Sequence, residues 1–285
     1  MTTVGIVSPG AMGSAVGGAL LRGGARVVAT VAGRSERTAG LARDAGLELV
    51  SGIADVVSAA EVVLSIVPPD QAEAVAAELS GARLRVDLNA VSPETARRIS
   101  DQVDGSISGP PPQHAGTTTI YLSGPRAGEV AALPFDGVRV VVVGDEVGAA
   151  SAVKMSTASV YKGSIALLAQ ALRAADHYGV VEHVLFDLGE PADAAARRIA
   201  RSAAKADRYV GEMHEIGVSQ AAAGLGPALF EAMAEVWAGI AHTPLGSVAP
   251  EDAGSELQEV LRRLRLVQGE LPERLDIRDA DTDES

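Results

Sequence analysis

The chain of 285 residues contains no cysteine. Disulfide bridges, thiolate–zinc sites and a cysteine nucleophile are therefore excluded. The sequence also lacks a run of about 18 uncharged apolar residues, the length that a membrane-spanning helix requires. The first residues carry no basic side chain, whereas a secretory signal begins with a basic segment. We therefore expect a cytoplasmic protein with no membrane partner.

Positive charge is scarce as well. The net charge of −13 argues against nucleic acid as a partner, because phosphate binding needs clustered lysine and arginine. Only three of the 24 basic residues are lysines, namely Lys154, Lys162 and Lys205. GC-rich codon usage explains the preference for arginine but not these three exceptions. An amine is therefore a candidate functional group at each of them.

Hydrophobic residues, by contrast, are plentiful. They make up 47% of the chain, which is enough to form a buried core. In the first half, apolar runs alternate with helical segments, which predicts a parallel sheet with crossover helices. The expected strands are residues 4–7, 26–31, 62–67, 84–88, 118–122 and 139–143. The expected helices among them are residues 12–21, 36–45 and 70–79.

The pattern changes after Gly144. Residues 146–178 contain no proline and one internal glycine, Gly163, which predicts a helix longer than the usual globular range. Further helices are expected over residues 191–223, 227–241 and 255–268. The last 16 residues carry seven acidic and two basic side chains and no apolar periodicity, which predicts a disordered tail. The expected fold class is α/β: a Rossmann-type dinucleotide-binding domain (1–145), an interdomain helix (146–178), an all-α substrate and dimerisation domain (179–269) and the tail (270–285).

A glycine-rich turn, Gly5-Ile-Val-Ser-Pro-Gly-Ala-Met-Gly13, follows the first expected strand and opens a helix. The dinucleotide fingerprint is G-x-G-x-x-G, and here it reads Ser8-x-Gly10-x-x-Gly13. Gly10 lets the backbone approach a pyrophosphate, and Gly13 lets the helix pack on the strand. The helix N-terminus offers free N–H groups to the phosphates. This turn predicts a dinucleotide cofactor.

The end of the second strand decides between NAD and NADP. NAD binders place a carboxylate there, about 20 residues beyond the glycines. This chain offers Arg34, Ser35 and Arg37, which suit a 2′-phosphate, so NADP is predicted and NAD is less favoured. The alternative is that these are surface residues at a helix start and that Glu36 contacts the ribose. The predicted cofactor-binding residues are Ser8, Gly10, Ala11, Met12, Gly13, Arg34, Ser35, Arg37, Val67, Pro68, Asn89 and Ser92.

Three further segments identify a family. They are Asp87-Leu-Asn-Ala-Val-Ser-Pro93, Ser106-Ile-Ser-Gly-Pro110 and Gly148-Ala-Ala-Ser-Ala-Val-Lys154. In this order, after the glycine-rich turn, they resemble the β-hydroxyacid dehydrogenases, which include 3-hydroxyisobutyrate dehydrogenase and 6-phosphogluconate dehydrogenase. The resemblance covers about residues 3–180, and the C-terminal part looks like that of a bacterial subgroup with no assigned function. It implies a cleft active site and a dimer through the helical domain.

The resemblance also implies site residues. The family's catalytic lysine corresponds to Lys154, and its substrate-contacting Ser-Gly-Gly turn corresponds to Ser108, Gly109 and Pro110. Pro110 lacks the backbone N–H of a second glycine. The asparagine expected four residues after the lysine is Ala158, and Thr157 offers a hydroxyl instead. These departures question the usual 3-hydroxy acid substrate.

The residues themselves support proton transfer by Lys154. Reduction of a carbonyl needs a proton for the nascent alkoxide, and an ammonium supplies both the proton and charge stabilisation. On a helix, Lys154 shares its face with Thr157, Ala158 and Tyr161, and these apolar and hydroxyl neighbours are expected to lower its pKa. The alternative is a surface lysine at a helix start. Lys162 is expected to have a structural or supporting role.

Other candidates surround this site. His114, in a proline-rich turn, is a candidate for contacting substrate, although a loop histidine often has no such role. Glu212 and Glu215 share a helix face and would suit a cationic or polyhydroxylated substrate, unless that face is a solvated or dimer surface. No histidine spacing suggests a metal. The leading function is an NADP-dependent oxidoreductase acting on a small hydroxyl or carbonyl compound; the alternatives are an imine reductase and a non-catalytic NADP-binding regulatory protein.

Overall fold

The computed structural model describes residues 1–113, 115–248, 254 and 256–265. The chain forms two compact units. The first comprises Met1–Ser164 and Arg208–Ala234, and the second comprises Ile165–Asp207 and Glu235–Ser285. Each unit is therefore built from two separate stretches of the chain, whereas the domain boundaries predicted from the sequence follow one another in order. That predicted division stays a prediction.

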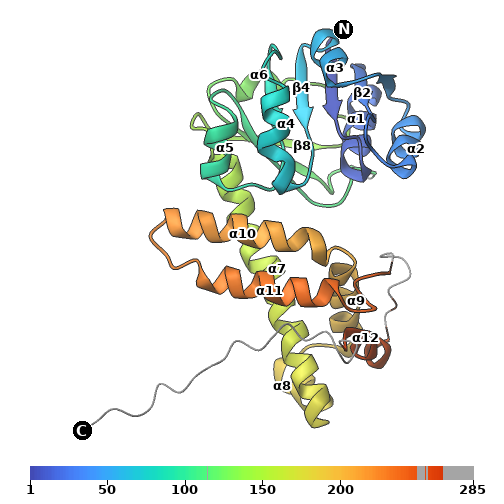
Figure 1. Ribbon diagram of the computed structural model, residues 1–285, viewed down its shortest axis with the longest axis vertical. Coiled ribbons are helices and arrows are strands. Elements are labelled where there is room, and N and C mark those ends of the chain that lie inside the picture. Colours follow the sequence, from blue (N-terminus) through green and yellow to red (C-terminus); the bar gives the residue numbers. More distant parts are fainter. Residues whose placement is uncertain (114, 249–253, 255, 266–285) are drawn as a thin grey trace. The chain divides into compact units, whose positions relative to one another are not determined.

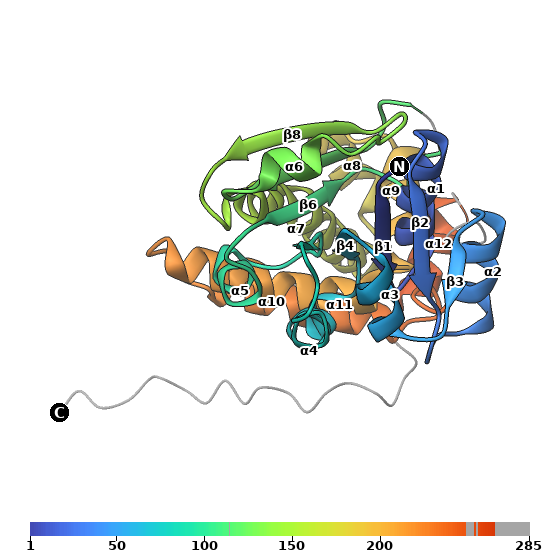
Figure 2. The same ribbon diagram turned by 90° about the horizontal axis from the view of Figure 1, so that it is seen from above.

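The first unit contains a sheet of eight strands in the order β3-β2-β1-β4-β5-β6-β7-β8. All neighbours are parallel except β6 and β7, which are antiparallel. Figure 2 shows β3 and β8 at opposite edges of this sheet. The strands are β1 (Thr3–Val7), β2 (Arg26–Thr30), β3 (Glu48–Val50), β4 (Val62–Ser65), β5 (Arg85–Asp87), β6 (Asp104–Ser108), β7 (Thr119–Ser123) and β8 (Arg139–Gly144).

The helices connect these strands and then make up most of the described residues that follow β8 (Figure 1). Those of the sheet region are α1 (Ala11–Arg22), α2 (Glu36–Asp44), α3 (Ile53–Ala59), the 3-10 turn η1 (Pro69–Gln71), α4 (Ala72–Glu78), α5 (Pro93–Ile99) and α6 (Ala127–Ala131). The later helices are α7 (Ala149–Tyr178), α8 (Val181–Leu188), α9 (Ala192–Ala203), α10 (Ala206–Ala222), α11 (Ala228–Ala241) and α12 (Leu257–Leu264). No helix of the described ranges is long and apolar enough to cross a membrane.

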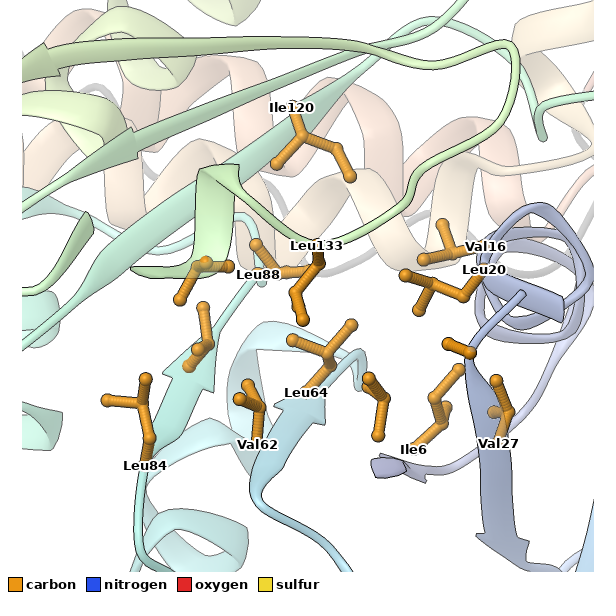
Figure 3. Packing of buried hydrophobic residues seen from close by; sticks show 14 of the residues in the cluster. Ile6, Val16, Leu20, Val27, Val62, Leu64, Leu84, Leu88, Ile120 and Leu133 are labelled. Carbon is orange, nitrogen blue, oxygen red and sulfur yellow. The ribbon is translucent and has the colours of Figure 1, made fainter. Parts of the chain in front are cut away.

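The core of the first unit fills the space between one face of the sheet and the helices that cover it (Figure 3). β-Branched residues dominate the strands because they pack well on a pleated surface. Ile6 of β1 and Leu64 of β4 meet Leu20 of α1 there, and all three side chains are fully buried. Gly17 allows this contact, because a Cβ at that position would lie 2.9 Å from the Cδ1 atom of Ile6. The first helix is therefore held close to the first strand.

The α/β fold class predicted from the sequence is confirmed, and the six predicted strands are present within two residues at each end. Two strands were not predicted. β6 consists of Asp-Gly-Ser-Ile-Ser, which has one large apolar residue and therefore no hydrophobic run, although four of its five residues are buried. The helix predicted over residues 191–223 is wrong in one respect: it is divided into α9 and α10 at Ala204 and Lys205. The helix predicted over residues 255–268 is present as α12 over Leu257–Leu264. Residues 255 and 266–268 and the predicted tail lie outside the described residues.

Candidate active site

The order of the strands indicates where a ligand of this sheet would bind. β1 has β2 on one side and β4 on the other, so the chain reverses its direction of winding between these strands. In open α/β sheets ligands bind at such a switch point, outside the carboxyl ends of the strands. The turn after β1 holds Ser8 and Gly10, and the turn after β4 holds Val67 and Pro68. The tertiary structure therefore brings together predicted cofactor residues that are about 60 positions apart.

The glycine-rich turn has the geometry that a pyrophosphate needs. Ser8 takes a left-handed conformation (φ 61°), the conformation that the fingerprint usually assigns to glycine. A Cβ at Gly13 would lie 2.9 Å from the Ser8 carbonyl oxygen, so glycine is required there. A Cβ at Gly10 would meet nothing within 4 Å, which leaves open space above the turn. The first turn of α1, which includes Ala11 and Met12, carries no acidic residue and offers its N–H groups to an anion.

Asn89 connects the end of β5 with the segment that follows β4, beside this turn. Its side-chain oxygen accepts a 2.6 Å hydrogen bond from the Val67 N–H. Its amide nitrogen donates to Asp87 Oδ2 at 2.6 Å, and the Asp87 carboxyl also accepts the Asn89 N–H at 2.9 Å. Burial raises the pKa of Asp87 to about 7, although these hydrogen bonds oppose the shift. Asn89 is buried, so the structure gives it a positioning role for the Val67–Pro68 turn.

The residues predicted to contact the 2′-phosphate follow β2. Arg34 lies within 3.2 Å of Gln71 Oε1 and Arg37 is exposed. Ser35 caps α2, where its side-chain oxygen accepts the Thr38 N–H at 3.4 Å. The nearby carboxylate of Glu36 forms an ion pair with Arg43. Two guanidinium groups therefore lie at the start of α2, and the one carboxylate of that helix start already has a cationic partner.

Lys154 lies at the end of β6. It belongs to the second turn of α7, and its Nζ donates a 2.7 Å hydrogen bond to the carbonyl oxygen of Ile107. Ser108 and Gly109 come directly after Ile107 in the chain, so the predicted lysine and the predicted substrate turn are neighbours. Burial, and then the charge of Arg208, lowers the pKa of Lys154 from 10.5 to about 8. An ammonium with this pKa holds its proton at neutral pH and releases it readily.

The turn that follows β6 requires glycine at its first position. Gly109 has φ 109°, and a Cβ there would lie 2.3 Å from the Thr117 carbonyl oxygen. The Thr118 hydroxyl donates to the Pro110 carbonyl at 2.6 Å, which closes the turn on itself. His114, predicted to contact substrate, lies outside the described residues. The substrate role of Ser108 and Gly109 stays a prediction, and the structure places both beside Lys154.

Asp104 positions the helix that carries Lys154, and the sequence did not single it out. Its carboxylate accepts the backbone N–H groups of Gly148 at 3.0 Å and Ser151 at 2.9 Å, at the N-terminus of α7. It also accepts the Ser151 hydroxyl at 2.7 Å and the Ser123 hydroxyl at 3.1 Å. A carboxylate that satisfies the free N–H groups of a helix start stabilises that start. Burial nevertheless raises the pKa of Asp104.

The two predicted carboxylates of α10 have different partners within the first unit. Glu212 forms a buried ion pair with Lys162, and its Oε1 lies 3.3 Å from Arg208 Nε. Glu215 accepts the Ser92 N–H at 2.6 Å and the Thr95 hydroxyl at 2.9 Å, at the N-terminus of α5. Both carboxylates therefore bind groups of the protein itself, and this weakens the interpretation that they form a joint receptor for a cationic substrate.

Two other predicted residues also make internal hydrogen bonds. Ser92 is fully buried and caps α5, where its hydroxyl accepts the Thr95 N–H at 3.2 Å. The exposed Thr157 hydroxyl donates to the helix carbonyls of Val153 at 2.9 Å and Lys154 at 3.2 Å. Their ligand-binding roles stay predictions. Among the described residues, no group of three or more histidine, aspartate and glutamate side chains is placed to hold a metal ion.

A doubly wound sheet with a glycine-rich turn at its switch point, and a lysine at the end of a neighbouring strand, define a dinucleotide-dependent oxidoreductase fold. Comparison with known proteins agrees. Residues 3–92 match the family model described as NADP oxidoreductase, coenzyme F420-dependent. Residues 175–240 match a domain of unknown function, DUF1932.

Three relatives carry the comparison further. An uncharacterized 28.5 kDa protein of Methanothermus fervidus is 30% identical over 168 residues, which are 56% of this chain and 66% of that protein, just under two thirds of its length. The conserved protein MTH1747, described as structurally similar to 3-hydroxyacid dehydrogenases, is 30% identical, with 87% of this chain and all of that chain covered and a TM-score of 0.64. The 3-hydroxyisobutyrate dehydrogenase of Mycobacterium tuberculosis shares the fold at 19% identity and a TM-score of 0.64, with 93% of this chain and 99% of that chain covered.

The chain therefore belongs to the β-hydroxyacid dehydrogenase superfamily, whose members are nicotinamide-dinucleotide-dependent oxidoreductases. The resemblance seen in the sequence motifs is confirmed.

Proposed function

We propose that this protein is an NADP-dependent oxidoreductase that interconverts a small hydroxyl compound and its carbonyl, with Lys154 as the proton donor and acceptor. The observation that carries the proposal is the hydrogen bond from the Lys154 ammonium to the carbonyl oxygen of Ile107, next to the Ser108–Gly109 turn. A nicotinamide, when bound, supplies or accepts the hydride. The protein's own task is then to hold the substrate oxygen near Lys154 and to move one proton.

The direction of proton transfer follows from the pKa of about 8. In the reduction direction the Lys154 ammonium gives its proton to the alkoxide oxygen that forms as the carbonyl is reduced. In the oxidation direction the neutral amine takes the hydroxyl proton. Ile107 holds the amine through one hydrogen bond, which leaves two donor positions of the ammonium for a substrate oxygen. The site is thus built for acid–base catalysis near neutral pH.

The proposed preference for NADP is supported by the charges at the start of α2. Arg34→Ala is expected to raise KM for NADPH by about ten- to one hundredfold, because a hydrogen bond to a charged group contributes about 1.5–3 kcal/mol. KM for NADH is expected to stay unchanged, because NADH carries no phosphate at this position. Steady-state oxidation of both cofactors measures this. A wild-type enzyme that prefers NADH, or equal effects of the substitution on both cofactors, contradicts the assignment.

The reaction itself is tested with a panel of aldehydes, keto acids and cyclic imines. Imine reduction is the second candidate, because Ala158 removes the amide that the family usually places after the lysine. Against it, the Lys154 ammonium would repel the positive charge of an iminium substrate. We therefore expect turnover of a carbonyl compound. Tight NADPH binding without turnover of any compound would favour a non-catalytic NADP-binding protein.

We also propose a homodimer formed through the helical C-terminal part. Phe186 and Leu188 of α8 are 84% and 57% exposed, and exposed apolar side chains that lie together mark interaction surfaces. Light scattering coupled to size-exclusion chromatography is expected to give twice the mass of the 29.0 kDa chain. Phe186→Asp is expected to shift the protein towards the monomer, and a monomeric wild type would contradict the proposal.

A further inference from the structure

Asp87 of β5 is a buried carboxyl group that the proposed reaction does not use. Its exposed fraction is 2%, and its neighbours Asn89 and Ser65 are each 3% exposed. Ser65 is its register partner on β4, and Asn89 follows it by two residues. Because so little solvent reaches these groups, each polar atom depends on a partner within the protein.

The side-chain amide of Asn89 is used at both ends. Its oxygen accepts the Val67 N–H at 2.6 Å, and its nitrogen donates to Asp87 Oδ2 at 2.6 Å and to Ser65 Oγ at 3.3 Å. A side-chain amide can turn over and exchange its oxygen and nitrogen. Here only one orientation satisfies both neighbours, because the Val67 N–H needs an acceptor and an ionised carboxylate needs a donor. The carboxylate of Asp87 therefore keeps the oxygen of Asn89 on the Val67 N–H.

This role of Asp87 depends on its negative charge. Asp87 Oδ1 also accepts the backbone N–H of Asn89 at 2.9 Å, as in an Asx turn, so both carboxylate oxygens face N–H donors. A protonated Asp87 would itself be a donor at one oxygen. It would then favour the other amide orientation, in which the NH₂ group of Asn89 faces the Val67 N–H and that buried N–H loses its acceptor.

The segment that this hydrogen bond fixes lies at the predicted cofactor site. β1 and β4 are adjacent parallel strands, and Val7 lies opposite Ser65 near their carboxyl ends. The Val67–Pro68 turn therefore begins beside the glycine-rich turn, at the switch point of the sheet. Pro68 has no N–H of its own, so the Val67 N–H is the backbone donor that anchors this turn.

The surroundings of Asp87 bring its titration into the neutral range. Burial is the main cause that raises the pKa of Asp87 to about 7, and the hydrogen bonds from Asn89 oppose it. Two carboxylates add to the rise, namely Asp104, its register partner on β6, and Glu215 of α10. Like charges disfavour a further negative charge nearby.

We propose that Asp87 is a positioning residue for the cofactor: its carboxylate holds the amide of Asn89 in the orientation that fixes the Val67–Pro68 turn, and protonation releases this turn and weakens cofactor binding. The inference rests on the proposed function, because it assumes that the Val67–Pro68 turn contacts the dinucleotide. Asp87 acts through Asn89 and does not touch the cofactor itself.

The first experiment measures NADP binding to the full chain by calorimetry between pH 6 and pH 8. We expect the affinity of the wild type to decrease as pH falls through about 7. Asp87→Asn has the same shape without the charge. It is expected to bind about three- to tenfold more weakly than the wild type at pH 8, through loss of one hydrogen bond, and equally at pH 6. The 2′-phosphate, whose pKa is about 6, affects both proteins alike.

Two further variants complete this experiment. Asn89→Ala removes the amide and is expected to lose the same step near pH 7, so it provides the test if Asp87→Asn does not fold. Asp136→Asn is the matched control, because Asp136 is an exposed aspartate of the same unit, paired with Arg22. It is expected to keep the affinity and the pH profile of the wild type.

The second experiment observes the turn without a cofactor. The amide signal of Val67 is followed by NMR in protein labelled with ¹⁵N-valine, and Val67→Ile identifies it by its absence. The signal is expected to titrate with a midpoint near pH 7 in the wild type and not in Asp87→Asn. Asp104→Asn removes one like charge, so the midpoint is expected at lower pH.

The outcomes separate this proposal from the proposed function. A Val67 signal that does not titrate in the wild type, or that titrates equally in Asp87→Asn, overturns the proposal. The same pH dependence of NADP affinity in the wild type and Asp87→Asn also overturns it. Absence of NADP binding by every protein, with a titration of Val67 that only Asp87→Asn loses, contradicts the proposed function and supports the link between Asp87 and the turn. Thermal unfolding shows that each variant is folded.

Discussion

Lys154→Ala is expected to lower kcat for NADPH-dependent reduction by about 10²–10⁴-fold, the usual contribution of a positioned proton donor. The reason is the position of the ammonium, which donates to Ile107 beside the predicted substrate turn and has a pKa of about 8. Dissociation of NADPH, measured by fluorescence, is expected to be unchanged. Lys205→Ala is the matched control, since Lys205 is an exposed lysine of the second unit. A Lys154→Ala enzyme that keeps about a tenth of the wild-type kcat would refute the proton-transfer role.

The pH dependence of the wild type follows from the same pKa. Reduction needs the ammonium, so its rate is expected to decrease as pH rises through about 8, whereas oxidation needs the amine and is expected to increase. Lys154→Arg keeps the positive charge at every accessible pH. It is therefore expected to remove the change in rate near pH 8 from both pH–rate profiles. Rate profiles measured in both directions check the sign. If the change in rate near pH 8 persists in Lys154→Arg, another group is responsible for the titration.

Stability is linked to the same group. The pKa of Lys154 is lower in the folded protein, about 8, than its ordinary value of 10.5 in an unfolded chain. Between these values the unfolded chain binds more protons, so the free energy of unfolding is expected to rise with pH across this window. Below pH 8 this contribution is absent and the buried ammonium costs stability. Lys154→Met is expected to lose this slope in urea unfolding measured from pH 7 to pH 10.

Glu212→Ala is expected to lower the free energy of unfolding by about 3–5 kcal/mol, because removal of one partner leaves the charge of Lys162 buried and uncompensated. The cation–π contact with Tyr209 remains but contributes only about 0.5–2 kcal/mol, too little to replace the carboxylate. Urea unfolding at pH 7 measures the change. A loss below about 1 kcal/mol would mean that water reaches Lys162 and that the pair behaves as a surface pair.

The double variant separates charge from packing. Lys162→Met combined with Glu212→Leu removes both charges and keeps apolar volume, and replacements of this kind are often neutral or stabilising. It is therefore expected to unfold at a higher urea concentration than Glu212→Ala alone. Asp193→Ala removes a carboxylate from an exposed pair with Arg197 and is expected to have little effect. A double variant no more stable than Glu212→Ala would mean that the site depends on the charges for its structure.

Much of the fold was predictable from local patterns. The valine-rich strands, the glycine-rich turn and the long helix that carries Lys154 each have a signature within a short window, because strand and helix periodicity are local properties. β6 had none. Its Asp-Gly-Ser-Ile-Ser sequence forms a strand because it pairs with β7. Asp104 also accepts a hydrogen bond from the N-terminus of α7, more than 40 residues along the chain. No sequence window contains that contact.

The sequence by itself determined the class of the protein and the candidate residues of its site. Gly10, Gly13 and Lys154 are set by backbone geometry and chemistry that a motif records. Only the tertiary structure decided the partners: Glu212 pairs with Lys162 and Arg208, and Glu215 binds the start of α5. The two carboxylates predicted to receive substrate also bind groups of the protein itself. The physical reason is that buried charge must be compensated by whatever group folding brings near, and that neighbour is fixed by packing rather than by position in the chain.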